Sequence, residues 1–176
     1  NSLEENNCSG NNDGIYLRES SNFNTLFANI CNDNDGSGIT IDSSLNNTMT
    51  ENICRGNLIG GITLNSASSV TTGNRIDNND CSGNAVTTEW GGGIFLSASP
   101  SYDMSNNTIS NNELSGNYYG IWILNAQKNV VASNNVLNNV ITGIYLSASS
   151  WNHIEANTLT GHDDSGIWLY SSDGCT

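Results

Sequence analysis

The sequence predicts an all-β solenoid of about seven coils, each made by a repeat of 22–24 residues. Two modules alternate along the chain: the tetrapeptide Gly-Ile-x-Leu, and a longer unit of the form Asn-x-Ile-x-x-Asn-x-Cys or Leu. Their apolar positions stand two or five residues apart, bounded by Gly, Asn and Ser, whereas a helical solenoid needs elements of about 10–12 residues with few glycines. Each coil therefore consists of strands and turns, and it buries its apolar side only by stacking on its neighbours.

The tetrapeptide predicts one strand in each coil. Its Ile and its final Leu or Ile are expected to point inward, because alternate residues of a strand face opposite sides. The seven copies lie at residues 14–17, 38–41, 61–64, 93–96, 120–123, 143–146 and 166–169. The spacing lengthens around the fourth copy, where the additional residues predict loops that protrude from the coil.

The longer unit supplies two further inward columns. The first is Leu3, Leu26, Met49, Ile76, Ile109, Val131 and Ile154, and the second is Cys8, Cys31, Cys54, Cys81, Leu114, Val136 and Leu159. Asparagine stands two residues before every member of both columns, which places 14 of the 32 asparagines. Because a side-chain amide both donates and accepts, asparagines stacked about 4.8 Å apart are expected to form hydrogen-bonded ladders along the axis.

Charge and composition exclude several classes of function. Seventeen acidic residues against four basic ones give a net charge of −13, which argues against a nucleic-acid partner, since phosphate binding needs clustered Lys and Arg. No run approaches the roughly 18 apolar residues of a membrane helix, so no membrane span is expected. Residues 1–176 are expected to form a single solenoid domain. Because the chain starts at Asn1, inside the repeat, we expect a fragment or mature part of a longer protein.

Units such as NNTISNNELSGNYYGIWIL, in which the two modules follow one another, resemble the right-handed parallel β-helix repeat family. The resemblance covers nearly the whole chain and implies a right-handed parallel β-helix. The family includes NosD-like periplasmic proteins and carbohydrate-binding and sugar-hydrolase domains of surface proteins, so an extracellular or cell-surface location is implied. The resemblance does not select an activity, because the same coil carries lyases, hydrolases, epimerases, adhesins and inert scaffolds.

One outward column is the main candidate for a binding surface. The residue between the two inward positions of each tetrapeptide points to solvent, and in the last four coils it is aromatic: Phe95, Trp122, Tyr145 and Trp168. Trp90, Tyr118 and Tyr119, in the turn before these strands, extend this stripe. An exposed aromatic stripe favours sugar stacking, lateral packing on another chain, or cross-strand stabilisation in solvent, and the sequence leaves the three open.

The acidic residues supply only weak catalytic candidates. Glu89 and Asp163 occupy the same turn three coils apart, about 14 Å, which exceeds the roughly 5 to 9.5 Å of a glycosidase pair. His162 with Asp163 and Asp164 forms either a small acid–base cluster or a solvated turn. The family resemblance implies that lyases of this fold use a basic residue beside calcium, but the four basic side chains occupy different columns: Arg18, Arg55, Arg75 and Lys128.

No cofactor is expected from the sequence, apart from calcium at the surface, for which Asp33 and Asp35 are weak candidates because they are spaced like the first ligands of a calcium loop. The column of Cys8, Cys31, Cys54 and Cys81 has three interpretations: a reduced packing ladder, disulfides between coils, or a soft-metal site. Cys175 stands outside this column, next to the terminus, and is a candidate for an intermolecular link.

Two functions remain from the sequence. The first is a non-enzymatic structural module of surface-layer, sheath or adhesin type, whose partners are copies of itself or other surface proteins. The second is a polysaccharide-binding or polysaccharide-degrading domain, with the aromatic stripe as subsites and the loops of the fourth coil as walls. The sequence favours the non-enzymatic function, and if the protein is an enzyme we expect it to act on polysaccharide.

Overall fold

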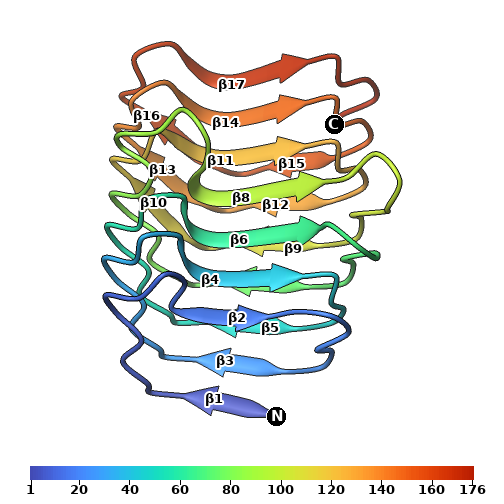
Figure 1. The fold of residues 1–176 in the computed structure, drawn as a ribbon. Helices are drawn as coiled ribbons and strands as arrows, with labels where there is room; N and C mark the ends of the chain where they lie inside the picture. The colour runs from blue at the N-terminus through green and yellow to red at the C-terminus, as the bar shows by residue number, and fades with distance from the viewer.

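The computed structural model describes residues 1–176 and confirms a parallel β-solenoid (Figure 1). Its 17 strands wind into coils that stack from the N-terminus at one end to the C-terminus near the other. The strands form three parallel sheets that run along the axis. The structure holds no helix that is long and apolar enough to cross a membrane.

The long-strand sheet is built from the seven Gly-Ile-x-Leu copies and faces the viewer in Figure 1. Its strands follow one another in chain order: β2 (Ile15–Leu17), β4 (Ser37–Asp42), β6 (Gly60–Ser66), β8 (Gly92–Ala98), β11 (Tyr119–Leu124), β14 (Thr142–Ser147) and β17 (Ser165–Tyr170). These strands carry the candidate binding surface.

The remaining two sheets form the rest of each coil. One has seven short strands: β1 (Ser2–Glu4), β3 (Thr25–Phe27), β5 (Thr48–Thr50), β7 (Arg75–Asp77), β9 (Thr108–Ser110), β12 (Val130–Ala132) and β15 (His153–Glu155). The other has three: β10 (Glu113–Ser115), β13 (Asn135–Leu137) and β16 (Thr158–Thr160). Isolated parallel bridges continue this third sheet toward the N-terminus, as between Ile30 and Ile53.

The four predicted inward columns form the core. Neighbouring coils are in register, so that Leu26 lies on Met49 and Ile39 on Ile62. The result is one cluster of 25 buried residues. A Cβ atom on Gly38 would lie only 2.7 Å from the carbonyl oxygen of Gly61 in the next coil, which explains why this tetrapeptide begins with glycine.

Both predicted asparagine ladders are present. The backbone N–H and the Nδ2 of Asn29 both donate to the Oδ1 of Asn52, at 3.0 and 2.9 Å. The Nδ2 of Asn52 also donates to the carbonyl oxygen of Leu26, at 3.0 Å. The side chains therefore pair buried backbone groups that the turns leave without a ladder partner, and buried polar groups need such partners.

The structure contains a third ladder that the sequence prediction missed. Its members stand three residues after the Cys/Leu column: Asn11, Asn34, Asn57, Asn84, Asn117 and Asn139. His162 takes the seventh position, where its Nδ1 accepts a hydrogen bond of 3.2 Å from the backbone N–H of Asn139. A histidine at the end of the column breaks the pattern in the sequence.

The additional residues around the fourth copy leave the coil as loops, as expected. They protrude at both ends of β8 in Figure 1. Asn79 and Asn112 are bonded across 33 residues, compared with 23 for Asn29 and Asn52. The loops therefore lengthen one coil without shifting the register of the stack.

Candidate functional site

The outward column of the long-strand sheet is aligned from end to end. Strand pairing places its members one above another: Tyr16, Thr40, Thr63, Phe95, Trp122, Tyr145 and Trp168. The four aromatic rings are stacked as predicted, with centroids 4.7 Å apart for Phe95–Trp122, 5.8 Å for Trp122–Tyr145 and 4.7 Å for Tyr145–Trp168.

The prediction that this stripe is exposed is wrong for its first two rings, Phe95 and Trp122. Phe95 is 7 % exposed and Trp122 is 6 % exposed, whereas Trp168 is 39 % exposed. Trp90 and Tyr119 cover the stripe, each with its ring centroid 5.2 Å from that of Trp122. Trp122 is thus enclosed by rings, its Nε1 buried without a hydrogen-bond partner. Sequence spacing gives the direction of a side chain but not what a neighbouring loop places over it.

The loop before β8 sets the position of Trp90. Gly91 follows it with φ of +123°, and a Cβ atom there would lie 1.8 Å from the carbonyl oxygen of Ile59. The N–H of Gly92 donates to that same oxygen at 3.1 Å. The hydroxyl of Thr88 donates to the carbonyl oxygen of Leu58 at 3.0 Å. These bonds fasten the loop to the preceding coil, and only glycine fits at its end.

A groove of about 210 Å³ opens on the same sheet face, between Tyr16 and Phe95. Thr40 and Thr63 occupy the outward column there, so short side chains separate two aromatic rings. The rest of the lining comes from Asp13, Ser37, Ile59 and Asn65. The sequence prediction missed this groove. The signal that indicates it is the pair of threonines, whose short side chains interrupt an otherwise aromatic column.

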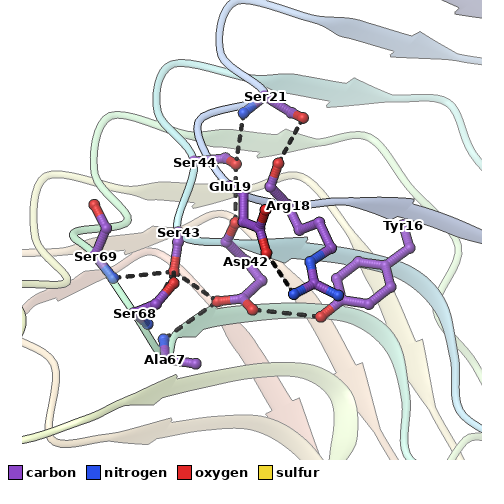
Figure 2. A network of polar contacts seen from close by, with 10 residues as sticks. All are labelled: Tyr16, Arg18, Glu19, Ser21, Asp42, Ser43, Ser44, Ala67, Ser68 and Ser69. Carbon is purple, nitrogen blue, oxygen red and sulfur yellow. Dashed lines mark hydrogen bonds and ion pairs between the residues drawn. The ribbon is translucent and has the colours of Figure 1, made fainter.

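Asp42 fixes Tyr16 at one end of the groove (Figure 2). Its carboxylate accepts hydrogen bonds from the Tyr16 hydroxyl at 3.3 Å and from the backbone N–H of Ala67 at 3.2 Å. The guanidinium of Arg18 lies 5.8 Å from the centroid of the Tyr16 ring and pairs with Glu19. Burial, followed by the charge of Asp42, raises the pKa of the Tyr16 phenol, which keeps it protonated as a donor.

The weak catalytic candidates do not form an acid–base cluster. His162 belongs to the third asparagine ladder, and burial lowers its pKa. Asp163 and Asp164 are exposed, and no hydrogen bond or ion pair joins either of them to His162. Glu89 and Asp164 instead both influence Tyr119. Burial is the main cause of the raised pKa of Tyr119, and the negative charges of these two acids raise it further.

No three His, Cys, Asp or Glu side chains gather as a metal site, and Asp33 and Asp35 are both exposed. All five cysteines are free. The thiols of the predicted column are stacked, and hydrogen bonding to Cys54, together with burial, raises the pKa of Cys31 far above its usual range. Cys175 is partly buried and its Sγ donates to the carbonyl oxygen of Ser149 at 3.4 Å.

Solved structures similar to this chain share its fold. The periplasmic alginate epimerase AlgG superposes with a TM-score of 0.57 at 16 % identity, covering 96 % of this chain and 48 % of that one. ORF18 of Geobacillus virus E2 superposes with a TM-score of 0.60 at 12 % identity, covering 98 % of this chain and 42 % of that one. The chain therefore spans less than half of either protein. No curated protein matches it in sequence.

Two family models match the sequence, and together they cover all of it. The right-handed β-helix region matches residues 1–101, and NosD, described as a periplasmic copper-binding protein, matches residues 77–176. Each match covers more than half of the chain. The chain therefore belongs to the right-handed β-helix proteins, and within them to the NosD family.

Proposed function

We propose that the chain is a polysaccharide-binding β-helix module of the periplasm or cell surface, which holds a glycan along the outer face of the long-strand sheet. The observation that carries the proposal is the groove between Tyr16 and Phe95, with polar side chains between two aromatic rings. Aromatic faces stack on apolar faces of ligands, and a few convergent polar groups orient them. A sugar ring offers both an apolar face and a rim of hydroxyls.

The end walls of the groove differ in access. Tyr16 is 46 % exposed and tethered through its hydroxyl to Asp42, so its ring is available and held in position. Phe95 is nearly buried, so little of its ring is accessible. Strands spaced about 4.8 Å apart put these two residues, three coils distant, about 14 Å apart along the axis. This length suits a short segment of a linear chain lying parallel to the solenoid axis.

A second accessible aromatic platform lies farther along the same face. Tyr145 and Trp168 stack there; Trp168 is exposed and Tyr145 is partly buried. Trp90 projects between this platform and the groove, and it is 65 % exposed. Contacts spread along one face of a rigid sheet favour an extended ligand over a compact one. The loops around β8 form the walls in this proposal.

Binding to a panel of neutral, amino and acidic oligosaccharides, followed by calorimetry, tests the proposal. Tyr16→Ala removes the accessible ring of the groove, and we expect it to weaken binding about tenfold through lost stacking and lost hydroxyl contacts. Trp168→Ala tests the second platform. Phe23→Ala and Trp151→Ala are matched controls, because both rings are highly exposed and lie outside the outward column. Binding by none of the oligosaccharides would overturn the proposal.

The location in the proposal draws on the comparisons. The NosD family is described as periplasmic, and AlgG is a periplasmic enzyme of alginate. An acidic surface with a net charge of −13 is compatible with either the periplasm or the cell surface. Fractionation of cells that express the full-length protein, with immunodetection of each fraction, tests this location.

Copper binding, which the NosD description names, is not part of the proposal, because the side chains of this chain do not fit a copper site. Such sites use thiolate, thioether or imidazole ligands that converge. Met49 and Met104 are buried in the core, and no three His, Cys, Asp or Glu side chains gather. Hydrogen bonding and burial raise the pKa of Cys31, which opposes the thiolate form that metals need.

A structural module is the second candidate function, because exposed rings on the same face, Trp90 at 65 % and Trp168 at 39 %, also suit lateral packing on another chain. Sedimentation of the purified chain over a wide concentration range tests self-association, and a strictly monomeric particle would count against it.

A further inference from the structure

Resting on the proposed function, we propose that the groove between Tyr16 and Phe95 accepts neutral or amino sugars and rejects sugars that carry carboxylate, sulfate or phosphate groups. The inference concerns the charge of the lining, which the fold does not determine. Asp13 contributes a carboxylate to the groove, and no basic side chain lines it.

The carboxylate of Asp13 is fixed in the wall of the groove. Its Oδ1 accepts hydrogen bonds from the backbone N–H of Ser37 at 3.0 Å and from the hydroxyl of Thr40 at 3.1 Å. Its Oδ2 accepts one from the Nδ2 of Asn12 at 3.1 Å. A carboxylate has about four lone-pair directions, so Oδ2 keeps capacity for a further donor. A sugar hydroxyl or ammonium group supplies such a donor, whereas a second carboxylate does not.

None of the four basic side chains compensates this charge. Arg18 is the one beside the groove, and it pairs with Glu19 while lying over the Tyr16 ring. Arg55 and Arg75 pair with carboxylates elsewhere in the coil. Lys128 lines a separate pocket of about 280 Å³ beside the loop after β8. Asp42, which holds Tyr16, adds a second negative charge at the same end of the groove.

The magnitude of the effect follows from the proximity of the charges. Two like charges about 5 Å apart at a protein surface repel enough to weaken binding about tenfold or more. Two opposite charges at that distance strengthen binding by a similar factor. An acidic sugar seated against Asp13 meets this repulsion without a cation to offset it. An amino sugar meets attraction instead, and a neutral sugar lies between the two.

The test compares three oligosaccharides of equal length by calorimetry, with EDTA present to remove bridging cations: a neutral β-glucan, a chitosan and a polygalacturonate. Asp13→Asn is the test variant, since asparagine keeps an oxygen for Ser37 and Thr40. Asp173→Asn is the matched control, with the same change in net charge on an exposed residue in the last coil. Thermal denaturation of both variants checks that the fold is kept.

We expect the wild type to bind chitosan most tightly, the β-glucan next and polygalacturonate at least tenfold more weakly than the β-glucan. Asp13→Asn should reduce the preference for chitosan about tenfold, and Asp173→Asn should leave it unchanged. Polygalacturonate binding as tight as β-glucan binding, weakened by Tyr16→Ala, would overturn this inference but uphold the proposed function. Unaltered ratios among the three affinities in Asp13→Asn would also overturn it. Failure of all three ligands to bind would overturn both.

Discussion

The side-chain amide of Asn79 donates a hydrogen bond of 3.1 Å to the Oδ1 of Asn112, although 33 residues separate them. The backbone N–H of Asn79 donates to the same oxygen at 2.9 Å. This pair spans the coil that carries the two long loops, and its geometry matches that of coils without them. Stacking thus depends on the ladder positions and not on the number of residues between them.

Replacing Asn79 with alanine should lower the free energy of unfolding by about 2–4 kcal/mol, because several buried groups lose partners at once. The Nδ2 of Asn79 also donates to the carbonyl oxygen of Met49 at 2.9 Å, and its Oδ1 accepts from Asn52. Urea denaturation measures the loss. Asn135→Ala is the control, since that side chain points outward and bonds only to Glu113. Equal losses in both variants would contradict the structural role of the ladder.

Gly91→Ala should distort the loop that carries Trp90, because φ of +123° and a contact of 1.8 Å with the Ile59 carbonyl oxygen leave no room for a Cβ atom. We expect a changed near-ultraviolet circular dichroism signal from the packed indoles of Trp90 and Trp122, together with a loss of stability. Gly83→Ala is the comparison, with φ of +69° but open space around its Cβ position, and should cost only about 1 kcal/mol. An unchanged aromatic signal in Gly91→Ala would argue against the described loop.

His162→Asn should complete the third ladder and remove part of the acid sensitivity of the protein. Burial lowers the pKa of His162, so below the unfolded pKa of about 6.5 the unfolded chain binds the proton more readily. The contribution of this histidine to stability is therefore complete above that pH and is lost as pH falls through the folded-state value. Denaturation midpoints at pH 7.5 and 5 measure the effect. The same difference between the two midpoints in His162→Asn as in the wild type would contradict this role of the histidine.

The cysteine column should resist alkylation in the folded protein. Cys31, Cys54 and Cys81 are buried, and the pKa of Cys31 is raised by hydrogen bonding to Cys54 and by burial. Iodoacetamide at pH 8 should modify Cys8 and Cys175 at most, with the other thiols reacting only after unfolding. Fewer than five thiols in the denatured, unreduced protein would show disulfides instead.

The raised pKa of Cys31 also predicts that the stability of the folded protein falls at alkaline pH. The contribution of Cys31 is complete below the unfolded pKa of about 8.5, since both states are then protonated. At higher pH the unfolded chain loses the proton first, so this contribution falls as pH rises. Cys31→Ala should flatten the decline in denaturation midpoint between pH 8 and 10, and a decline as steep as that of the wild type would contradict this.

The fold was predictable because each coil repeats the same constraints. Inward columns such as Ile39–Ile62 and ladders such as Asn29–Asn52 follow from spacing alone, and the strand register confirms them. The third ladder was missed because His162 replaces its last asparagine. A periodic pattern is easy to detect only where its members are identical, although the hydrogen bond needs only an acceptor at that position.

The candidate site was less predictable, because it depends on the loops that join the repeats and on the size of individual outward side chains. Spacing places Phe95 and Trp122 in one outward column, but the loop that brings Trp90 over them has no repeat to reveal its path. The groove arises where Thr40 and Thr63 interrupt the aromatic column, and the charged residue in its lining, Asp13, is a turn residue. Such features depend on side-chain size and loop conformation, which periodicity does not encode.

Each asparagine ladder also has a direction. The Nδ2 of Asn24 donates to the Oδ1 of Asn47, and that of Asn47 to the Oδ1 of Asn74, so within the ladder each side-chain oxygen accepts from the preceding coil. Every amide-to-amide bond of the ladder therefore crosses a junction in the same sense, while an Nδ2 such as that of Asn52 also donates to a backbone carbonyl oxygen of the preceding coil. A coil fits on this stack only with its chain running the same way, because an inverted coil would oppose like groups. The amide dipoles therefore add along the axis, and each added coil continues the ladder with hydrogen bonds in the same direction.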